Sequence, residues 1–423
     1  VRQASLCLAM GSGLACCRSS SVTSGRFSPG PATPGELTSE HELLVKTPTQ
    51  QAAAVQAAKE IQEVHDAATA MRSSNGFKDY FHSMLQKAQI PDIGVTPWDR
   101  FTGAGFEALL ETLDLVDAQY LVSLGRAGGI VPRWQDLPEA AKISKEQIWR
   151  LQLWPQDYSL PVLVLSYPWL DRKHPDRLGT QLFSFVAILQ YLVAMAQEHS
   201  PHATIGVVWD YPCLPQKPFS SETEKQRFKL GLGSINRWYS HPFLIVLMVT
   251  TALPTDATYT IIRSYEERGW CFFEASISSL VKDPFVLWDL SNYRAGALPN
   301  TFRGFCELMA VGRKPPMSPP RFEEQMRAAI HSGKMAFTAG ADLDVVIEQY
   351  AAGFVAAFEL FKGIRKHRPL FYDGLAWDDT SEEQLIDALT HVKERCIFPE
   401  GALGIDLRGN KFSVEASSRI SSL

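Results

Sequence analysis

The hydrophobic pattern between residues 160 and 290 alternates between short continuous apolar runs and longer segments with helical spacing. The continuous runs are too short for helices and are typical of strands that are buried on both faces. They cover residues 160–167, 203–209, 243–250 and 284–290. Apolar positions every three or four residues separate them, at residues 178–198, 222–239 and 265–281. This alternation predicts an α/β fold, a parallel sheet with helices on both faces.

Helical spacing without strand-like runs flanks this segment on both sides. On the N-terminal side it predicts helices at residues 55–71, 80–85, 106–116 and 139–151. On the C-terminal side it predicts helices at residues 322–329, 343–361 and 381–396. We therefore expect five parts: a lead-in (1–48), a helical region (49–155), the α/β domain (156–295), a second helical region (315–400) and a tail (401–423).

The tail contains one short motif. Ile405, Leu407, Asn410 and Phe412 fit the LxLxxNxL core of a leucine-rich repeat. We find no segment that repeats at a fixed period, and a single repeat cannot bury its own apolar face. The match is therefore either chance or the start of an array that a longer chain would continue.

The composition argues against several classes of protein. Hydrophobic residues make up 45% and charged residues 21%, which is typical of a soluble globular chain. The formal net charge of −5 provides no chain-wide basic surface for nucleic acid. No apolar run reaches the roughly 20 residues that a membrane-spanning helix needs. The seven cysteines include no CxxC pair, so we expect no zinc site and no disulfide framework. We also expect an intracellular, reducing compartment such as the cytoplasm.

The first 35 residues have a composition of their own. They contain three arginines and no acidic residue, which suits a disordered tail or an organelle-targeting peptide. If translation starts at Met10, Gly11 becomes a myristoylation site and Cys16 and Cys17 become palmitoylation sites. Two such lipids suffice to anchor a protein to a membrane. Ala15 stands where the myristoylation motif prefers Ser or Thr, and all three interpretations stay open.

Polar and aromatic residues follow the predicted strands, at the edge where parallel sheets bind ligands. Ser166, Tyr167 and Trp169 come at the end of the first strand, and Asp210 comes at the end of the second. Asp210 has two interpretations: a turn carboxylate that accepts hydrogen bonds from local backbone N–H groups, or an acceptor for a ligand hydroxyl.

Glu274 is the carboxylate with the most unusual position. On a helical wheel of residues 265–281 it lies beside Trp270, at the edge of the apolar stripe. A carboxylate at such an edge is partly removed from water, so its charge needs a partner or serves a function. The structural alternative is an ion pair with Arg268, Arg263 or another cation at the edge of the buried face.

Other motifs point to no chemistry. His174-Pro175-Asp176 matches the signature of J-domains, but an apolar strand precedes it here instead of a basic helix, so His174 is expected to shape the end of the strand. Cys213 and Cys271 have no histidine nearby in the sequence and are expected to be packing residues. No phosphate-binding glycine loop follows any strand, which argues against Rossmann and P-loop sites.

Taken together, these residues resemble a Toll/interleukin-1 receptor (TIR) domain. The resemblance rests on the strand ending in Leu165-Ser166-Tyr167, the strand ending at Asp210, and the helix with Trp270-Cys271-Phe272-Phe273-Glu274. It implies a flavodoxin-like sheet at residues 156–295. The segment between Ser166 and Glu274 is longer than in a compact TIR domain. The chain is also similar to a group of uncharacterised protist and algal proteins. Four segments resemble phrases that recur in that group: Ser166-Tyr167-Pro168-Trp169, His174-Pro175-Asp176-Arg177-Leu178-Gly179, Trp209-Asp210-Tyr211 and residues 265–274.

The resemblance implies a function for these residues. Glu274 matches the catalytic glutamate of TIR-type NAD hydrolases, which need no cofactor because NAD is their substrate. Cleavage of the nicotinamide–ribose bond develops positive charge on the ribosyl carbon, and a fixed carboxylate stabilises it. Ser166 and Asp210 would line the site, and Tyr167, Trp169 or Trp270 would stack on a ring of the ligand.

Two alternatives to this enzyme remain. TIR enzymes usually complete their site by self-association, so the resemblance also implies self-association through this domain. In the first alternative the domain is a non-enzymatic interaction module in which Glu274 forms a structural ion pair. In the second, the sheet binds a nucleotide and performs another chemistry.

Overall fold

The computed structural model describes the chain from residue 107 to residue 422 with several gaps. The described ranges are 107–144, 162–199, 204–242, 244–253, 258–294, 302–310, 312–338, 342–364, 369–395, 397–398 and 403–422. All of them belong to one compact unit, Pro48–Leu423. The predictions for the lead-in, for the lipid sites Gly11, Cys16 and Cys17, and for the first two helices lie outside the described residues.

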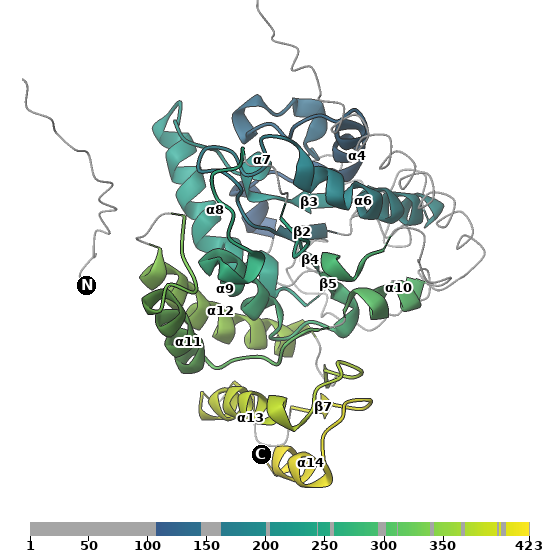
Figure 1. The fold of residues 1–423 in the computed structure, drawn as a ribbon, viewed down its shortest axis with the longest axis vertical. Coiled ribbons are helices and arrows are strands. Elements are labelled where there is room, and N and C mark those ends of the chain that lie inside the picture. Colours follow the sequence, from purple (N-terminus) through teal and green to yellow (C-terminus); the bar gives the residue numbers. More distant parts are fainter. Residues whose placement is uncertain are drawn as a thin grey trace, which may run out of the picture. The chain divides into compact units, whose positions relative to one another are not determined.

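Five strands form the central sheet (Figure 1). They are β1 (Val116–Asp117), β2 (Val162–Ser166), β3 (Gly206–Val208), β4 (Ile245–Met248) and β5 (Leu287–Asp289). Their order is β1-β3-β2-β4-β5; β1 is antiparallel to β3, and the other four strands are parallel. The predicted α/β class with a mostly parallel sheet is thus confirmed. The chain runs from β2 to β3 on one side and then to β4 on the other, so the strand order reverses between β2 and β4.

Two groups of helices pack around the sheet. On one side, α4 (Ala118–Arg126) packs against α6 (Thr180–His199), and a Cβ atom on Gly125 would lie only 2.2 Å from Val186. The other group consists of α8 (Glu222–Ser240), α9 (Gly269–Ser278) and the C-terminal α12 (Leu343–Ile364), which all contact one another. The short helix α7 (Asp210–Cys213) follows β3, and α10 (Phe302–Met309) contacts β5. In Figure 1 the two groups lie on different sides of the strands.

The predicted helix at residues 265–281 is wrong at its start. Tyr265–Glu267 forms a separate 3-10 turn, and α9 begins only at Gly269. Arg268 between them is extended, with φ −107° and ψ 123°. The reason is a pair of long-range backbone hydrogen bonds. The N–H of Gly269 donates to the carbonyl of Ala336 at 3.1 Å, and the N–H of Ala336 donates to the backbone carbonyl of Glu267 at 3.0 Å. These bonds hold the backbone extended at Arg268.

Other differences from the expected elements are local. The predicted strand at residues 284–290 starts as a 3-10 turn, Pro284–Val286. The predicted helix at 106–116 is a 3-10 helix, Glu107–Glu111, followed by β1. The predicted helix at 139–151 is a 3-10 turn at Glu139–Ala141, and residues 145–161 are outside the described part. Helices α4 and α10 were not predicted.

The C-terminal helices α11 (Pro319–His331) and α12 share one hydrophobic core with the sheet. Phe322 on α11 stacks on Tyr350 of α12 with ring centroids 3.8 Å apart, and it also stacks on Phe272 of α9 at 5.5 Å. Phe322, Tyr350 and the neighbouring Phe273 are fully buried. The C-terminal region therefore covers the outer side of α9.

Two short parallel strands organise the end of the chain. Strand β6 (Leu370–Phe371) pairs with β7 (Ile405–Asp406), and each leads through a glycine turn into a helix, α13 (Asp379–Glu394) and α14 (Val414–Ser421). Both glycines have positive φ, 67° at Gly374 and 77° at Gly409, which favours glycine. Asn410, in the turn after β7, joins that turn to the turn after β6. Its Oδ1 accepts from the N–H groups of Leu375 and Trp377, both at 3.1 Å.

These two strand–turn–helix units correspond position by position at an offset of 35 residues. The expectation that nothing repeats is therefore wrong. The motif in the tail is the second of two units and does not stand alone.

Candidate functional site

Glu274 lies at the carboxyl end of the central strand β2. Its Oε2 atom accepts a hydrogen bond of 2.6 Å from the hydroxyl of Ser166, the last residue of β2. The Tyr265 hydroxyl lies 2.5 Å from the same Ser166 oxygen. Because the single hydroxyl proton of Ser166 is used in the hydrogen bond to Glu274, the Tyr265 hydroxyl donates to the Ser166 oxygen. The structure thus brings together β2, the 3-10 turn before α9, and α9 itself; we call Ser166, Tyr265 and Glu274 the hydroxyl–carboxyl cluster.

Burial raises the pKa of Glu274 to about 8. Hydrogen bonding from Ser166 and Tyr239 favours the ionised form and lowers the pKa, whereas the nearby charge of Asp210 raises it further. A carboxyl group with this pKa is mostly protonated at neutral pH until a cation approaches it. Its side chain is partly exposed, while Ser166 below it is fully buried.

The cations that the sequence suggested as ion-pair partners of Glu274 bind elsewhere. Arg268 donates to the carbonyl oxygens of Arg263 and Ile261, at 3.1 and 3.2 Å. Arg263 donates to the carbonyl of Gly333 at 3.3 Å. The side-chain partners of Glu274 are therefore hydroxyl groups.

Tyr167, Trp169 and Asp210 form a second cluster, which joins the ends of β2 and β3. One carboxylate oxygen of Asp210 accepts from the Tyr167 hydroxyl, and the other accepts from Nε1 of Trp169 at 3.2 Å. Burial raises the pKa of Asp210, and these two hydrogen bonds act against that effect. Tyr167 is only 6% exposed, so its ring is not available for stacking on a ligand. The ring of Trp169 packs edge-on against Tyr211 at 5.7 Å.

Trp270 contacts the C-terminal helical region. Its indole N–H donates to Oδ2 of Asp342 at 2.9 Å, and its ring packs edge-on against Phe273 and Phe337. The contacts of Trp270 therefore connect α9 to the start of α12. The expected packing role of Cys213 and Cys271 fits the structure, since burial raises the pKa of both thiols and keeps them protonated.

A cleft of about 730 Å³ opens at the carboxyl ends of β2 and β4, where the strand order reverses. Its walls come from residues 171–177 after β2, 260–268 after β4 and 336–338 after α11. We call it the basic cleft, because its lining includes Arg172, Lys173, Arg177, Arg263 and Arg268 but only one carboxylate, Asp171. The sequence analysis missed this site. The available signal was the position of these cations, which all follow the carboxyl ends of two strands.

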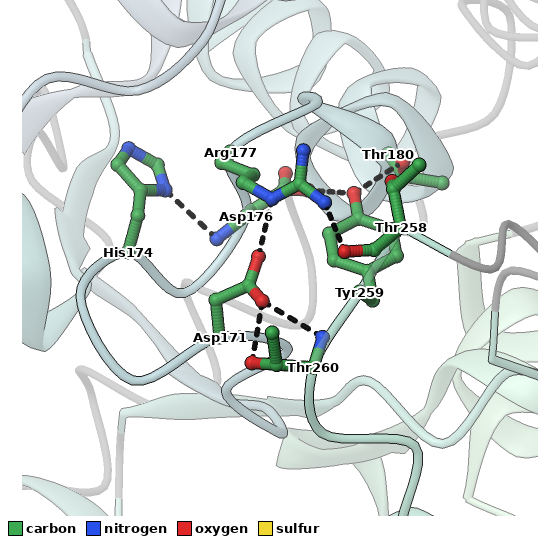
Figure 2. Close-up of polar contacts among 8 residues, drawn as sticks. All are labelled: Asp171, His174, Asp176, Arg177, Thr180, Thr258, Tyr259 and Thr260. Carbon is green, nitrogen blue, oxygen red and sulfur yellow. Dashed lines mark hydrogen bonds and ion pairs between the residues drawn. The ribbon is translucent and has the colours of Figure 1, made fainter.

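Asp171 ties two walls of the basic cleft together (Figure 2). One oxygen accepts from the N–H and the hydroxyl of Thr260, at 2.8 and 2.6 Å. The other accepts from Nε of Arg177 at 2.6 Å. Burial alone would raise the pKa of Asp171, but the bonds from Thr260 and Arg177 outweigh it and hold the pKa below its ordinary value. Arg177 also donates to the carbonyl of Thr258 and lies over the ring of Tyr259.

The His174-Pro175-Asp176 motif caps helix α6. The buried carboxylate of Asp176 accepts from the N–H groups of Gln181 and Leu182, both at 3.0 Å. Nδ1 of His174 accepts from the N–H of Asp176, so the other ring nitrogen, Nε2, donates to the carbonyl of Val131 at 3.0 Å. Burial lowers the pKa of His174, which keeps the ring neutral. The motif therefore begins helix α6 and binds the preceding loop to Val131, while the expected role of His174 at the end of the strand stays a prediction.

Comparison with models of known protein families, with curated proteins and with solved structures finds no match to this chain. Within the described residues, no three His, Cys, Asp or Glu side chains are arranged to hold a metal ion. None of the helices in the part of the chain that the structure describes combines the length and the apolar character needed to span a membrane.

Proposed function

We propose that this protein is a TIR-like enzyme that hydrolyses the bond between nicotinamide and ribose in NAD, with Glu274 as the catalytic carboxylate. The observation that carries the proposal is the bond between Glu274 and Ser166 at the end of the central strand. The order of the parallel strands, β3-β2-β4-β5, also supports the proposal, because it corresponds to the first four positions of the flavodoxin-like order 2-1-3-4-5. In such sheets, ligands bind at the carboxyl ends of the strands beside the reversal, which is where Ser166 lies.

The raised pKa of Glu274 is compatible with this reaction. The nicotinamide ring of NAD is a cation, and a cation close to the carboxyl group lowers its pKa, so binding of NAD would ionise Glu274. When the bond breaks, its electron pair leaves with nicotinamide and the positive charge moves to the ribosyl carbon. The Glu274 carboxylate stabilises that charge, water adds to the carbon, and one proton is released. Fixed charge of this kind is typically worth ~3 to 4 kcal/mol.

The test is release of nicotinamide from NAD by the full chain, measured at several protein concentrations because TIR enzymes act as assemblies. The Glu274→Gln variant keeps the shape of the side chain but cannot carry its charge, so we expect a loss of activity of ~100-fold or more. Glu266→Gln removes an exposed carboxylate nearby and is the matched control. We also expect kcat/KM of the wild type to rise with pH up to about pH 8, where free Glu274 ionises.

A second candidate is a TIR-like interaction module without catalysis. It is favoured by one observation: Glu274 does not line the basic cleft, and its hydrogen-bond partners belong to the protein. In that case no NAD is cleaved at any protein concentration, and the Glu274→Gln substitution changes only stability.

A further inference from the structure

We infer that the basic cleft binds a ligand with two linked phosphate groups and a flat ring, in the chemical class of nucleoside diphosphates. Glu274 does not line this cleft, so the inference holds whether or not the proposed hydrolysis takes place. It rests on four features of the cleft: its charge, a buried arginine, the rigidity of its walls and one aromatic side chain.

The charge of the cleft is opposite to that of the chain. The whole chain has a formal net charge of −5, yet the cleft has five cationic side chains and one carboxylate. That carboxylate, Asp171, is already bound to Arg177 and Thr260. Within the described part of the chain, Arg172, Lys173 and Arg263 form no ion pair. An anion with more than one charge is therefore the ligand that this cleft would attract most strongly.

Arg268 lies deepest among these cations and is only 5% exposed. Its two hydrogen bonds use Nε and Nη2, and both acceptors are backbone carbonyls, which carry no full charge. Among the described residues, no hydrogen-bond acceptor contacts Nη1, which is therefore the atom that a ligand would meet. Within the described part of the chain, the carboxylate that acts on this buried guanidinium is Glu267, which does so without a direct ion pair and is shared with Arg263. A phosphate group at Nη1 would supply a further charge at hydrogen-bond distance. Burial and the neighbouring Arg263 lower the pKa of Arg268, and a bound anion would reverse that effect.

The walls of the cleft are held in place before any ligand arrives. The two hydrogen bonds that Thr260 donates to Asp171 connect the segment after β4 to the segment after β2. Figure 2 shows Arg177 fixed between Asp171 and the carbonyl of Thr258. The third wall is attached through Ala336, whose backbone bonds to Glu267 and Gly269. Little conformational entropy of these backbone segments is then lost on binding, which favours affinity.

Part of the cleft lining is apolar: Ile261 from one wall, and Ala336 and Phe337 from another. The Phe337 ring lies directly on the backbone of Gly269, where an added Cβ would come within 2.3 Å of it. A ring held in this way offers a flat surface to a base. Cationic walls beside an aromatic ring suit a nucleotide better than a bare phosphate. The volume of about 730 Å³ is within the range of ~300 to 1,000 Å³ that small ligands occupy.

The experiment is calorimetric titration of the full chain with ADP, with pyrophosphate, with adenosine and with vesicles that contain a phosphoinositide. We expect ADP to bind most tightly, pyrophosphate more weakly and adenosine not at all, with ADP affinity falling as salt rises. Equal binding of adenosine and ADP would overturn the inference. Binding to the vesicles without binding of ADP would overturn the nucleotide class and indicate a lipid headgroup.

Variants at the rim locate the binding site. Lys173→Gln and Arg263→Gln remove cations that are not fully buried, so we expect the folded structure to persist, and each should weaken ADP binding about tenfold. Lys229→Gln and Arg126→Gln are matched controls, because they remove exposed cations on α8 and α4. Wild-type affinity in the Lys173/Arg263 double variant would refute the site. The Glu274→Gln variant should bind ADP like the wild type, so failure of the proposed hydrolysis stays separate from failure of this site.

Discussion

The protonated state of Glu274 predicts a specific dependence of stability on pH. The pKa of the folded state is about 8, against 4.5 for an ordinary glutamate. Below pH 4.5 the group is protonated in both states and contributes nothing. Between pH 4.5 and 8 the unfolded chain loses the proton while the folded chain keeps it, so stability falls as pH rises. Above pH 8 the group is ionised in both states, so stability no longer changes with pH through this group.

The size of this effect follows from the pKa difference. Each unit of pKa corresponds to ~1.4 kcal/mol, so wild-type stability should fall by about 4 kcal/mol between pH 5 and pH 8 through this group alone. Glu274→Gln cannot ionise and should lack this contribution. The measurement is urea unfolding of both proteins at several pH values, with Glu266→Gln as the exposed control. If the free energies of unfolding of wild type and Glu274→Gln ran parallel over this range, the group would be ionised in the folded state and the reasoning would fail.

Two further predictions concern residues that join distant segments. Asp171→Asn removes the charge that holds Arg177 but leaves an oxygen that can accept from Thr260. We expect the free energy of unfolding, measured in urea at pH 7, to fall by about 1 to 3 kcal/mol. An unchanged free energy of unfolding would show that other contacts hold the two walls together. Asn410→Ala leaves the N–H groups of Leu375 and Trp377 without their acceptor. It should lower the free energy of unfolding by a similar amount and speed hydrogen exchange at these two amides. Unchanged exchange would contradict the role of Asn410.

The strands were predictable where burial on both faces left a continuous apolar run. Strands β2, β3 and β4 all lie within such runs, although each is shorter than its run. Strand β1 has only two residues, too few to show any pattern. The break at Arg268 was not predictable either, because it depends on Ala336, which is far away in the sequence.

The candidate site was predictable in the same uneven way. Ser166 and Glu274 could be named because one ends a strand and the other lies at the edge of a helical stripe. Their direct hydrogen bond, and the third member Tyr265, required the structure. The cations of the basic cleft are spread over three segments and follow no motif, so only folding reveals them as one surface. The repeat at the end of the chain was hidden because Leu375 stands in the first unit where Asn410 stands in the second.

The packing of the C-terminal helices on α9 has a consequence for how this protein can be divided in the laboratory. A fragment that stopped at residue 295 would keep every strand of the central sheet, yet it would uncover Phe272 and Phe273 and lose the wall that contains Phe337. Such a fragment would carry an apolar patch prone to aggregation. Expression trials, crystallisation and activity assays on the α/β segment should therefore include the chain through α12.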